Sequence, residues 1–309
     1  MSTLREALGD YLAMRRALGF KLRSDGVALS SFVSFLDHAH VDYISTQHAR
    51  AWAQMPTSVQ PVRWAQRLCF VRGFARYCSA IDPRTEIPPL GLLSFHHQRP
   101  TPYRFTDEDI RGLLLRSLEL PADDGLAKHT FYCLFGLLSV TGMRISEALR
   151  LTLEDVDLDE AVLIVHSSKF GKSRLVPLHA STVKVLVDYS TRRAQFLNGR
   201  LVPHWFVNRR GERLGYYAVL RIFRRLTRTL GLVSQGRRRP RLHDLRHRFA
   251  QATLLQWYRN GDDVERRLPV LSTYLGHVEI RDTYWYLSAC PELLEAAKDR
   301  MEKNWERTP

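Results

Sequence analysis

The sequence TGMRISEALRL, residues 141–151, places charged side chains in otherwise apolar surroundings. The preceding residues 128–140 are apolar on nearly all sides, which predicts a buried helix that ends at Thr141–Gly142. A further helix is predicted over residues 143–151. Arg144 lies at its start, and Glu147, three residues later, shares its helix face and is placed to hold the guanidinium in an ion pair. The stretch therefore predicts a mainly helical domain with a charged group at a helix start.

The elements around this stretch are also mostly helical. Thr106 with the acidic residues 107–109 is typical of a helix N-terminus. Two short apolar runs, residues 161–165 and 174–178, flank the sequence HSSKFGKS and predict a β-hairpin with Lys169 near its tip. Helices are predicted over residues 216–228, 243–257, 263–274, 282–288 and 291–304.

The first part of the chain is predicted to be wholly helical. Helices are expected over residues 4–14, over 27–36 after a start signal at Ser24–Asp25, over 48–53 and over 59–77. The last of these has an apolar stripe, and Arg63 and Arg67 lie on its other side. Prolines between residues 82 and 102 interrupt any helix and indicate a linker. We expect a helical N-terminal domain over residues 1–95, a linker over 96–104 and a second domain over 105–309.

The charge of the chain indicates a polyanionic partner. Its 309 residues include 46 Lys plus Arg and 32 Asp plus Glu, a formal net charge of +14. Residues 201–250 hold 13 Arg, no Lys and two acidic residues, so most of this surplus is local. Arginine has planar, forked donors that suit phosphate, although a flexible solvated loop is the alternative interpretation for residues 237–239. The predicted DNA-binding residues are Arg63, Arg67, Arg221, Arg224, Arg225, Arg237, Arg238, Arg239 and Arg241.

Other classes of protein fit the sequence poorly. The four cysteines form no CxxC motif and no metal-ligand set, which argues against a disulfide framework or a zinc site. The most apolar run, residues 131–140, is about half the length that a bilayer requires. The N-terminus has acidic residues and no continuous apolar core, unlike a secretory signal. We therefore expect a cytoplasmic protein with no metal, no cofactor and no membrane partner.

Polar residues at five places in apolar contexts suggest chemistry on a phosphodiester. Two guanidiniums can bind the non-bridging oxygens, a tyrosine hydroxyl can act as nucleophile, and a lysine can protonate the leaving oxygen. No acidic cluster that would hold Mg²⁺ accompanies them, so metal-free chemistry is expected. Each residue alone has an ordinary structural explanation, and Tyr284 is a close rival of Tyr286. The candidates are Arg144, Lys169, His243, Arg246, His277 and Tyr286.

The stretches TGMRISEALRL, SSKFGKSRLVPL, LHDLRHRFA and YLGHVEIRDTYWYL resemble the tyrosine recombinases of the phage integrase family, over about residues 141–288. The resemblance implies that Arg144 and Arg246 are the catalytic arginines, that Lys169 is the hairpin lysine, and that His243 and His277 are the two histidine positions. It also implies that Tyr286 is the nucleophile. The hairpin reads KFGK, so Lys172 is a possible substitute for Lys169.

The resemblance further implies a fold and a mechanism. The fold is a helical, SAM-like core-binding domain followed by a mostly α catalytic domain with a small β-hairpin. Family members form a 3′-phosphotyrosine and exchange strands through a Holliday junction without metal or ATP. Four protomers act on double-stranded DNA, linked by a C-terminal helix, for which residues 291–305 are the candidate. Packing of this helix on its own domain is the alternative.

The expected function is therefore site-specific DNA recombination for the integration or transposition of a mobile element. The protein would act as a homo-tetramer, alone or with sister recombinases, in association with the nucleoid. Two other functions remain open from the sequence. One is a catalytically inactive DNA-binding accessory protein on the same scaffold. The other is an enzyme resembling a type IB topoisomerase, which shares phosphotyrosine chemistry.

Overall fold

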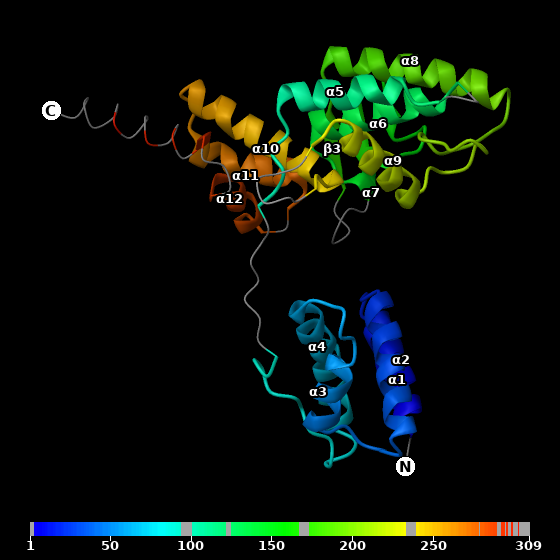
Figure 1. Cartoon of the computed structure of the whole chain (residues 1–309), viewed down its shortest axis with the longest axis vertical. Helices are drawn as coiled ribbons and strands as arrows, with labels where there is room; N and C mark the ends of the chain where they lie inside the picture. The colour runs from blue at the N-terminus through cyan, green and yellow to red at the C-terminus, as the bar shows by residue number, and fades with distance from the viewer. Residues whose placement is uncertain are drawn as a thin grey trace. The chain divides into compact units, whose positions relative to one another are not determined.

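The computed structural model describes residues 3–93, 101–121, 125–166, 173–232, 239–277 and 279–288, together with residues 292, 293, 295, 298 and 302. The chain divides into two compact units, residues 1–100 and 101–309 (Figure 1). The described residues are mainly helical, with one small antiparallel sheet. Residues 96–100 of the predicted linker lie outside them. No helix in the described ranges is long and apolar enough to cross a membrane.

Unit 1 is formed by the helices α1 (Leu4–Ala17), α2 (Arg23–His38), α3 (Thr46–Gln54) and α4 (Pro61–Cys78). Their apolar faces enclose a core that includes Phe32, Trp52 and Phe74. The start of α2 differs from the prediction, because the helix begins at Arg23 without a side-chain cap and the preceding Leu22 is in the left-handed conformation. Ser24 and Asp25 therefore lie inside the first turn.

Unit 2 contains eight helices among its described residues. The helix α6 (Ala127–Thr141) is buried along most of its length and packs against α5, α8 and α10 (Figure 1). This confirms the prediction of a buried helix. Thr106 caps α5 in a reciprocal capping box with Asp109, as the sequence predicted. The other helices are α5 (Asp107–Leu118), α7 (Ile145–Ala148), α8 (Ala180–Leu197), α9 (Tyr216–Thr229), α10 (Leu242–Arg259), α11 (Val264–Leu275) and α12 (Arg281–Ser288).

The helix predicted over residues 143–151 is shorter in the structure. Only the four residues of α7 are helical, because the chain then pairs with a distant segment. The Trp205 amide donates to the carbonyl of Leu151 at 2.8 Å, and Thr152 forms a β-bridge with His204. These bonds satisfy backbone groups that a longer helix would have paired internally.

The sheet carries the predicted hairpin. Its strands are β1 (Val156–Asp157), β2 (Val162–Val165) and β3 (Arg174–Pro177), in the order β1-β2-β3. β2 and β3 are antiparallel, and Val165 pairs with Arg174 at the end next to the turn. Residues 167–172 of the turn, which include Lys169 and Lys172, lie outside the described part of the chain.

A separate core holds the C-terminal elements together. α10, α11 and α12 enclose Leu254, Leu271, Leu275 and Tyr286. Most of the predicted C-terminal helix, residues 291–305, lies outside the described ranges. At its beginning, Leu293 is buried in this core, and Glu292 forms an ion pair with Arg104 at 2.6 Å.

Candidate active site

Arg246 lies where the ends of two helices meet. Its side chain comes from the first turns of α10 and is only 2% exposed. Nη1 donates to the carbonyl of Gly142, which ends α6, at 2.9 Å, and Nη2 donates to the carbonyl of Leu275, the last residue of α11, at 2.6 Å. Helix C-termini carry partial negative charge from unpaired carbonyls, so they stabilise a cation at this place. Burial nonetheless lowers the pKa of Arg246.

Arg144 approaches the same place from the start of α7. Nη1 donates to Glu147 Oε1 at 2.8 Å, and Nη2 donates to the carbonyl of Gly276 at 2.9 Å. The predicted ion pair between Arg144 and Glu147 is thus confirmed. The Arg144 side chain is 21% exposed, so part of its guanidinium faces solvent. Such a guanidinium, held at its inner edge and open at its outer edge, is suited to an oxyanion.

The sequence analysis did not identify Arg174 as part of the site. Arg174, the first residue of β3, donates to both oxygens of Glu147, with Nη2 to Oε2 at 2.7 Å and Nη1 to Oε1 at 3.2 Å. Burial alone would raise the pKa of Glu147, but the hydrogen bonds from Arg174 and Arg144 and their charges lower it to about 2. The carboxylate is therefore ionised at neutral pH and lies between two guanidiniums.

Tyr286 lies inside the site, whereas Tyr284 does not. Tyr286 is 2% exposed and Tyr284 is 50% exposed, although both belong to α12. Burial raises the pKa of the Tyr286 phenol, and the positive charges of Arg246 and Arg144 oppose this rise. The arginines thus favour the phenolate in an environment that otherwise disfavours it.

Two predicted histidines belong to the same site. The His277 ring stacks on that of Tyr286, and its Nδ1 lies 2.7 Å from the hydroxyl of Thr283. Desolvation, followed by the charges of Arg246 and Arg144, lowers the pKa of His277 to about 4. Desolvation, followed by the charge of Arg246, also lowers the pKa of His243 to about 4, although His243 as a whole residue is exposed. Both imidazoles are neutral at neutral pH.

His247 is a second residue that the sequence analysis missed. It is buried between the rings of His243 and Tyr286, with centroid distances of 4.6 Å and 5.3 Å. Desolvation and then the charges of its neighbours lower its pKa to about 3. Its position one turn after His243 on α10 was the only available signal, because residues four apart share a helix face.

The structure brings together five of the six predicted catalytic residues, from the starts of α7 and α10, the end of α11 and the helix α12. Lys169 lies outside the described ranges, as does Lys172. The strands that flank their turn end beside the site, because Arg174 both pairs with Val165 and binds Glu147. In the described ranges no group of three or more His, Cys, Asp or Glu side chains is arranged to hold a metal.

The predicted DNA-binding arginines have varied surroundings. The Arg67 guanidinium lies over the Trp52 ring, 3.6 Å from its centroid, and donates to the Trp52 carbonyl at 2.9 Å. Arg241 caps α10 by binding the buried Asp244. Both guanidiniums are thus held by the protein. The Arg241 side chain is nevertheless 50% exposed. The other exposed residues are Arg63, Arg221, Arg224, Arg225 and Arg239, while Arg237 and Arg238 lie outside the described residues.

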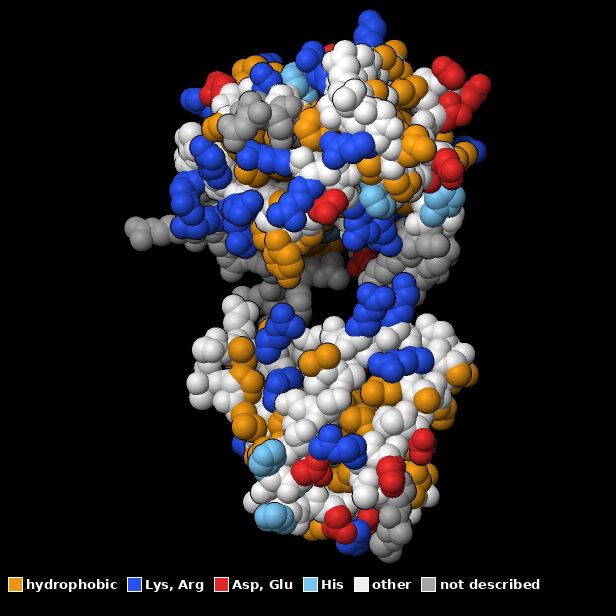
Figure 2. Space-filling view, turned by 90° about the vertical axis from the view of Figure 1, so that its right-hand side faces the viewer, with side chains coloured by type: hydrophobic (Ala, Val, Ile, Leu, Met, Phe, Trp, Pro, Cys, Tyr) orange, Lys and Arg blue, Asp and Glu red, His pale blue; other side chains and the backbone are white. Residues whose placement is uncertain are grey.

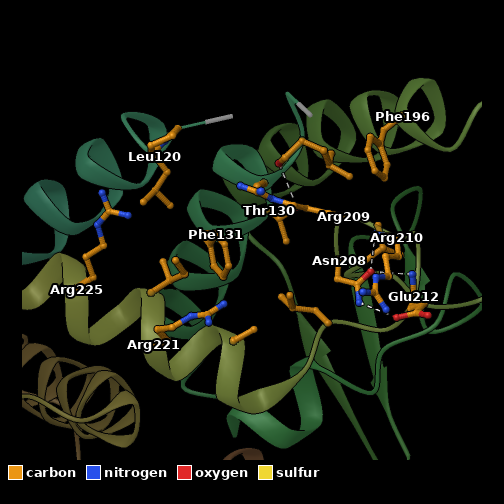
Figure 3. Close-up of a pocket in the computed structure, with 17 residues that line it drawn as sticks. Leu120, Thr130, Phe131, Phe196, Asn208, Arg209, Arg210, Glu212, Arg221 and Arg225 are labelled. Carbon is orange, nitrogen blue, oxygen red and sulfur yellow. Dashed lines mark hydrogen bonds between the residues drawn. The ribbon is translucent and has the colours of Figure 1, made fainter. Parts of the chain in front are cut away.

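Arg221 and Arg225 also border a pocket at the beginning of α6, the end opposite to Gly142. Its volume is about 550 Å³, and apolar residues such as Phe131 and Phe196 form much of its wall (Figure 3). Glu212, an acidic residue of this wall, accepts a hydrogen bond through Oε2 from Asn208 Nδ2 at 3.1 Å. Basic side chains are also spread over the face of unit 2 that Figure 2 shows. Among the described residues that line this pocket there is no tyrosine and no histidine.

Comparison with known proteins identifies the family. Residues 112–292, more than half of the chain, match the phage integrase family. The chain belongs to the phage integrase family of tyrosine recombinases. The y4rB protein of Sinorhizobium fredii, named as an integrase/recombinase, is 50% identical over 99% of both chains. The tyrosine recombinase XerD of Caulobacter vibrioides is 30% identical over 76% of this chain and 73% of its own. Membership in this family makes the protein a DNA recombinase.

Solved structures of tyrosine recombinases share the fold. The integrase of the transposon Tn1549, in complex with transposon right end DNA, matches 98% of this chain and 99% of its own, with a TM-score of 0.66 and 16% identity. The lambda integrase tetramer bound to a Holliday junction matches 92% of this chain and 77% of its own, with a TM-score of 0.64 and 17% identity. The predicted fold, mainly α with a small sheet, is confirmed.

Proposed function

We propose that this tyrosine recombinase cuts and rejoins DNA at a specific site through a covalent bond to Tyr286. The observation that carries the proposal is the burial of the Tyr286 phenol beside the guanidiniums of Arg246 and Arg144, each anchored to a backbone carbonyl at the end of a helix. A phenol is a weak nucleophile at neutral pH, and nearby cations stabilise its ionised form. Tyr284 is half exposed and lacks this environment.

The cleavage step uses the site residues in defined roles. The Tyr286 oxygen attacks the scissile phosphorus, and the bond between phosphorus and the 5′ oxygen breaks, which leaves a 3′-phosphotyrosine. The phenolic proton passes to a neutral imidazole of His243 or His277, and Lys169 donates a proton to the departing 5′ oxygen. Arg144 and Arg246 stabilise the charge on the non-bridging oxygens. Because guanidiniums supply this charge, the step requires no metal ion.

We further propose that four protomers carry out strand exchange through a Holliday junction, either alone or with sister recombinases. The lambda integrase tetramer on such a junction supports this arrangement. Residues 291–305 would link neighbouring protomers, although the ion pair of Glu292 with Arg104 ties the start of this segment to its own unit. Residues 1–95 would act as the core-binding domain, and the linker at 96–104 would connect it to the catalytic domain.

The biological role that we propose is integration or transposition of a mobile element, with the protein at the nucleoid. The similarity in fold to the Tn1549 integrase in complex with transposon DNA supports this role. The exposed arginines of α9 and Arg239 would bind phosphates, and such contacts give affinity without sequence preference.

A selection for covalent attachment tests the proposal. Short randomised duplexes that contain a nick are incubated with the protein, so that the cleaved fragment diffuses away and any adduct persists in detergent. We expect wild-type protein and Tyr284→Phe to yield an adduct at one enriched sequence, and Tyr286→Phe to bind the same DNA without an adduct. Loss of the adduct in Tyr284→Phe instead would overturn the assignment.

The two alternatives give different outcomes in the same experiment. An accessory DNA-binding protein would retard the DNA but form no adduct with the wild-type chain. An enzyme similar to a type IB topoisomerase would form adducts without enriching a sequence and would relax any supercoiled plasmid. A recombinase requires its site on two duplexes and yields recombinant products.

A further inference from the structure

Glu147 is a buried carboxylate shared by two arginines from different parts of the chain. Its side chain is 1% exposed, and it accepts hydrogen bonds from the Arg144 side chain, the Arg144 amide and both Nη atoms of Arg174. The Arg174 side chain is 9% exposed, compared with 21% for Arg144. Arg174 therefore lies on the inner side of the carboxylate, and Arg144 lies on the side closer to solvent.

The net charge of Arg144, Glu147 and Arg174 determines how strongly Arg144 attracts a phosphate. Arg144 and ionised Glu147 alone would form a neutral pair, and a neutral pair attracts a phosphate only weakly. Arg174 adds one positive charge, so the three side chains together carry one net positive charge. The interaction is not screened by bulk water, because Glu147 and Arg174 are both buried.

The geometry also fixes the direction of the Arg144 guanidinium. Gly276 is in the left-handed conformation with φ +67°, and a Cβ at this position would lie 3.0 Å from Arg174 Nη1 and 3.4 Å from Arg144 Nη1. The two guanidiniums therefore pack against the backbone at the end of α11. Two of the five N–H groups of Arg144 bind Glu147 and Gly276. The other three have no partner in the part of the chain that the structure describes.

We propose that Arg174 is a positioning residue: it neutralises Glu147, so that Arg144 keeps its positive charge and its orientation toward the scissile phosphate. Arg174 itself does not touch the DNA. The inference rests on the proposed role of Arg144 in cleavage. A purely structural role is the competing explanation, because Arg174 also anchors the base of the hairpin through its pairing with Val165.

Chemically modified DNA separates these explanations. The enriched duplex is prepared with a normal scissile phosphate, with a neutral methylphosphonate, or with sulfur in place of the 5′ oxygen. The neutral substrate has less need of positive charge, and the thiolate leaves without protonation. Cleavage rates are compared for wild type, Arg174→Gln, Arg174→Lys and Lys169→Ala. Arg192→Gln is the matched control, because Arg192 is exposed and pairs with Asp188 on α8.

We expect Arg174→Gln to slow cleavage of the normal phosphate by about tenfold to a hundredfold, less than the loss of a direct oxyanion donor. The loss should persist with the sulfur substrate and shrink on the methylphosphonate. Arg174→Lys should restore part of the rate, and Lys169→Ala should be rescued by sulfur. An equal loss of Arg174→Gln on all three substrates would show a structural role, and rescue by sulfur would place Arg174 at the leaving group.

A second variant tests the charge balance directly, with each cleavage rate expressed per folded protein. Glu147→Gln removes the charge that Arg174 neutralises, so Glu147→Gln combined with Arg174→Gln should cleave faster than Arg174→Gln alone. A slower double variant would overturn the inference. The proposed function is tested separately, since its failure would already appear in wild-type protein and Arg192→Gln, as a missing adduct or an adduct without an enriched sequence.

Discussion

The imidazole of His277 lies nearly parallel to the phenol of Tyr286, with ring centroids 5.9 Å apart and an angle of 24° between the planes. The hydroxyl of Thr283, one turn before Tyr286 on the same helix side, holds His277 Nδ1 at 2.7 Å. The helix that carries the proposed nucleophile therefore also orients the histidine beside it. Movement of α12 would displace both groups together.

Thr283→Val should test this coupling. The substitution keeps the shape of the buried side chain but removes the hydroxyl, so His277 loses its orienting partner. We expect cleavage to slow by about tenfold, which corresponds to one hydrogen bond, with unchanged DNA affinity. Thr273→Val is the control, since in the described part of the chain the Thr273 hydroxyl binds the carbonyl of Pro269 within α11 and no site residue. Equal rates in both variants would contradict the expectation.

Gly276→Ala should abolish cleavage for a reason that a control can isolate. The new Cβ would contact the guanidiniums of Arg174 and Arg144. In addition, the alanine backbone would have to adopt the left-handed conformation. Gly261→Ala has the same backbone strain at φ +75° but open space around the Cβ. Both variants should lose about 1 kcal/mol of unfolding free energy, measured by urea denaturation. Only Gly276→Ala should lose adduct formation, and an active Gly276→Ala would show that the close packing is not required.

The stability of the fold should depend on pH through His247. Its pKa of about 3 in the folded state lies below the value of about 6.5 expected when unfolded, so the unfolded chain binds more protons between these values. The unfolding free energy should therefore fall as the pH falls. In His247→Phe the slope of the unfolding free energy against pH, between about pH 5 and pH 6, should be smaller by about 1 kcal/mol per pH unit than in wild type. Identical slopes would mean that His247 titrates normally.

The arginines of α9 should contribute to DNA affinity through phosphates. Arg221→Gln combined with Arg225→Gln should reduce the slope of log affinity against log salt by about two units, one for each lost contact. Arg192→Gln is again the control. A slope equal to that of wild type would assign these two arginines to the pocket of Figure 3 instead of the DNA.

Metal removal should leave the reaction intact. Because two guanidiniums are proposed to stabilise the phosphate, adduct formation should proceed at the same rate after dialysis against a chelator as with added Mg²⁺. The rate of attachment to the enriched duplex measures this. A rate that recovers only on addition of Mg²⁺ would require a metal in the cleavage step.

Local patterns in the sequence predicted the elements whose causes are local. The buried α6, the Thr106 cap, the hairpin strands and the pair of Arg144 with Glu147 all depend on residues near one another in the chain. The sequence analysis missed α8, although its buried residues recur at helical spacing, because β-branched residues and serine at its start weaken the helical signal.

Features that join distant segments could not be predicted in this way. Arg174 binds Glu147 across 27 residues, and no spacing rule relates a strand to a helix turn at that distance. The position of Arg67 over Trp52 likewise depends on how α3 packs against α4. The helix α7 is short because the residues after it pair with a segment far along the chain, around Trp205. Site residues that interact through tertiary contacts therefore required the structure.

Arg246 has two roles. The guanidinium that faces the phenol of Tyr286 also donates hydrogen bonds to the carbonyls at the ends of α6 and α11. Its removal would leave those buried carbonyls unpaired, a cost in stability that Tyr286→Phe does not carry. Among descendants that have abandoned recombination, we therefore expect the tyrosine to vary first and the arginine to persist. An Arg246 retained in such a chain would reflect its role in folding and not a role in catalysis.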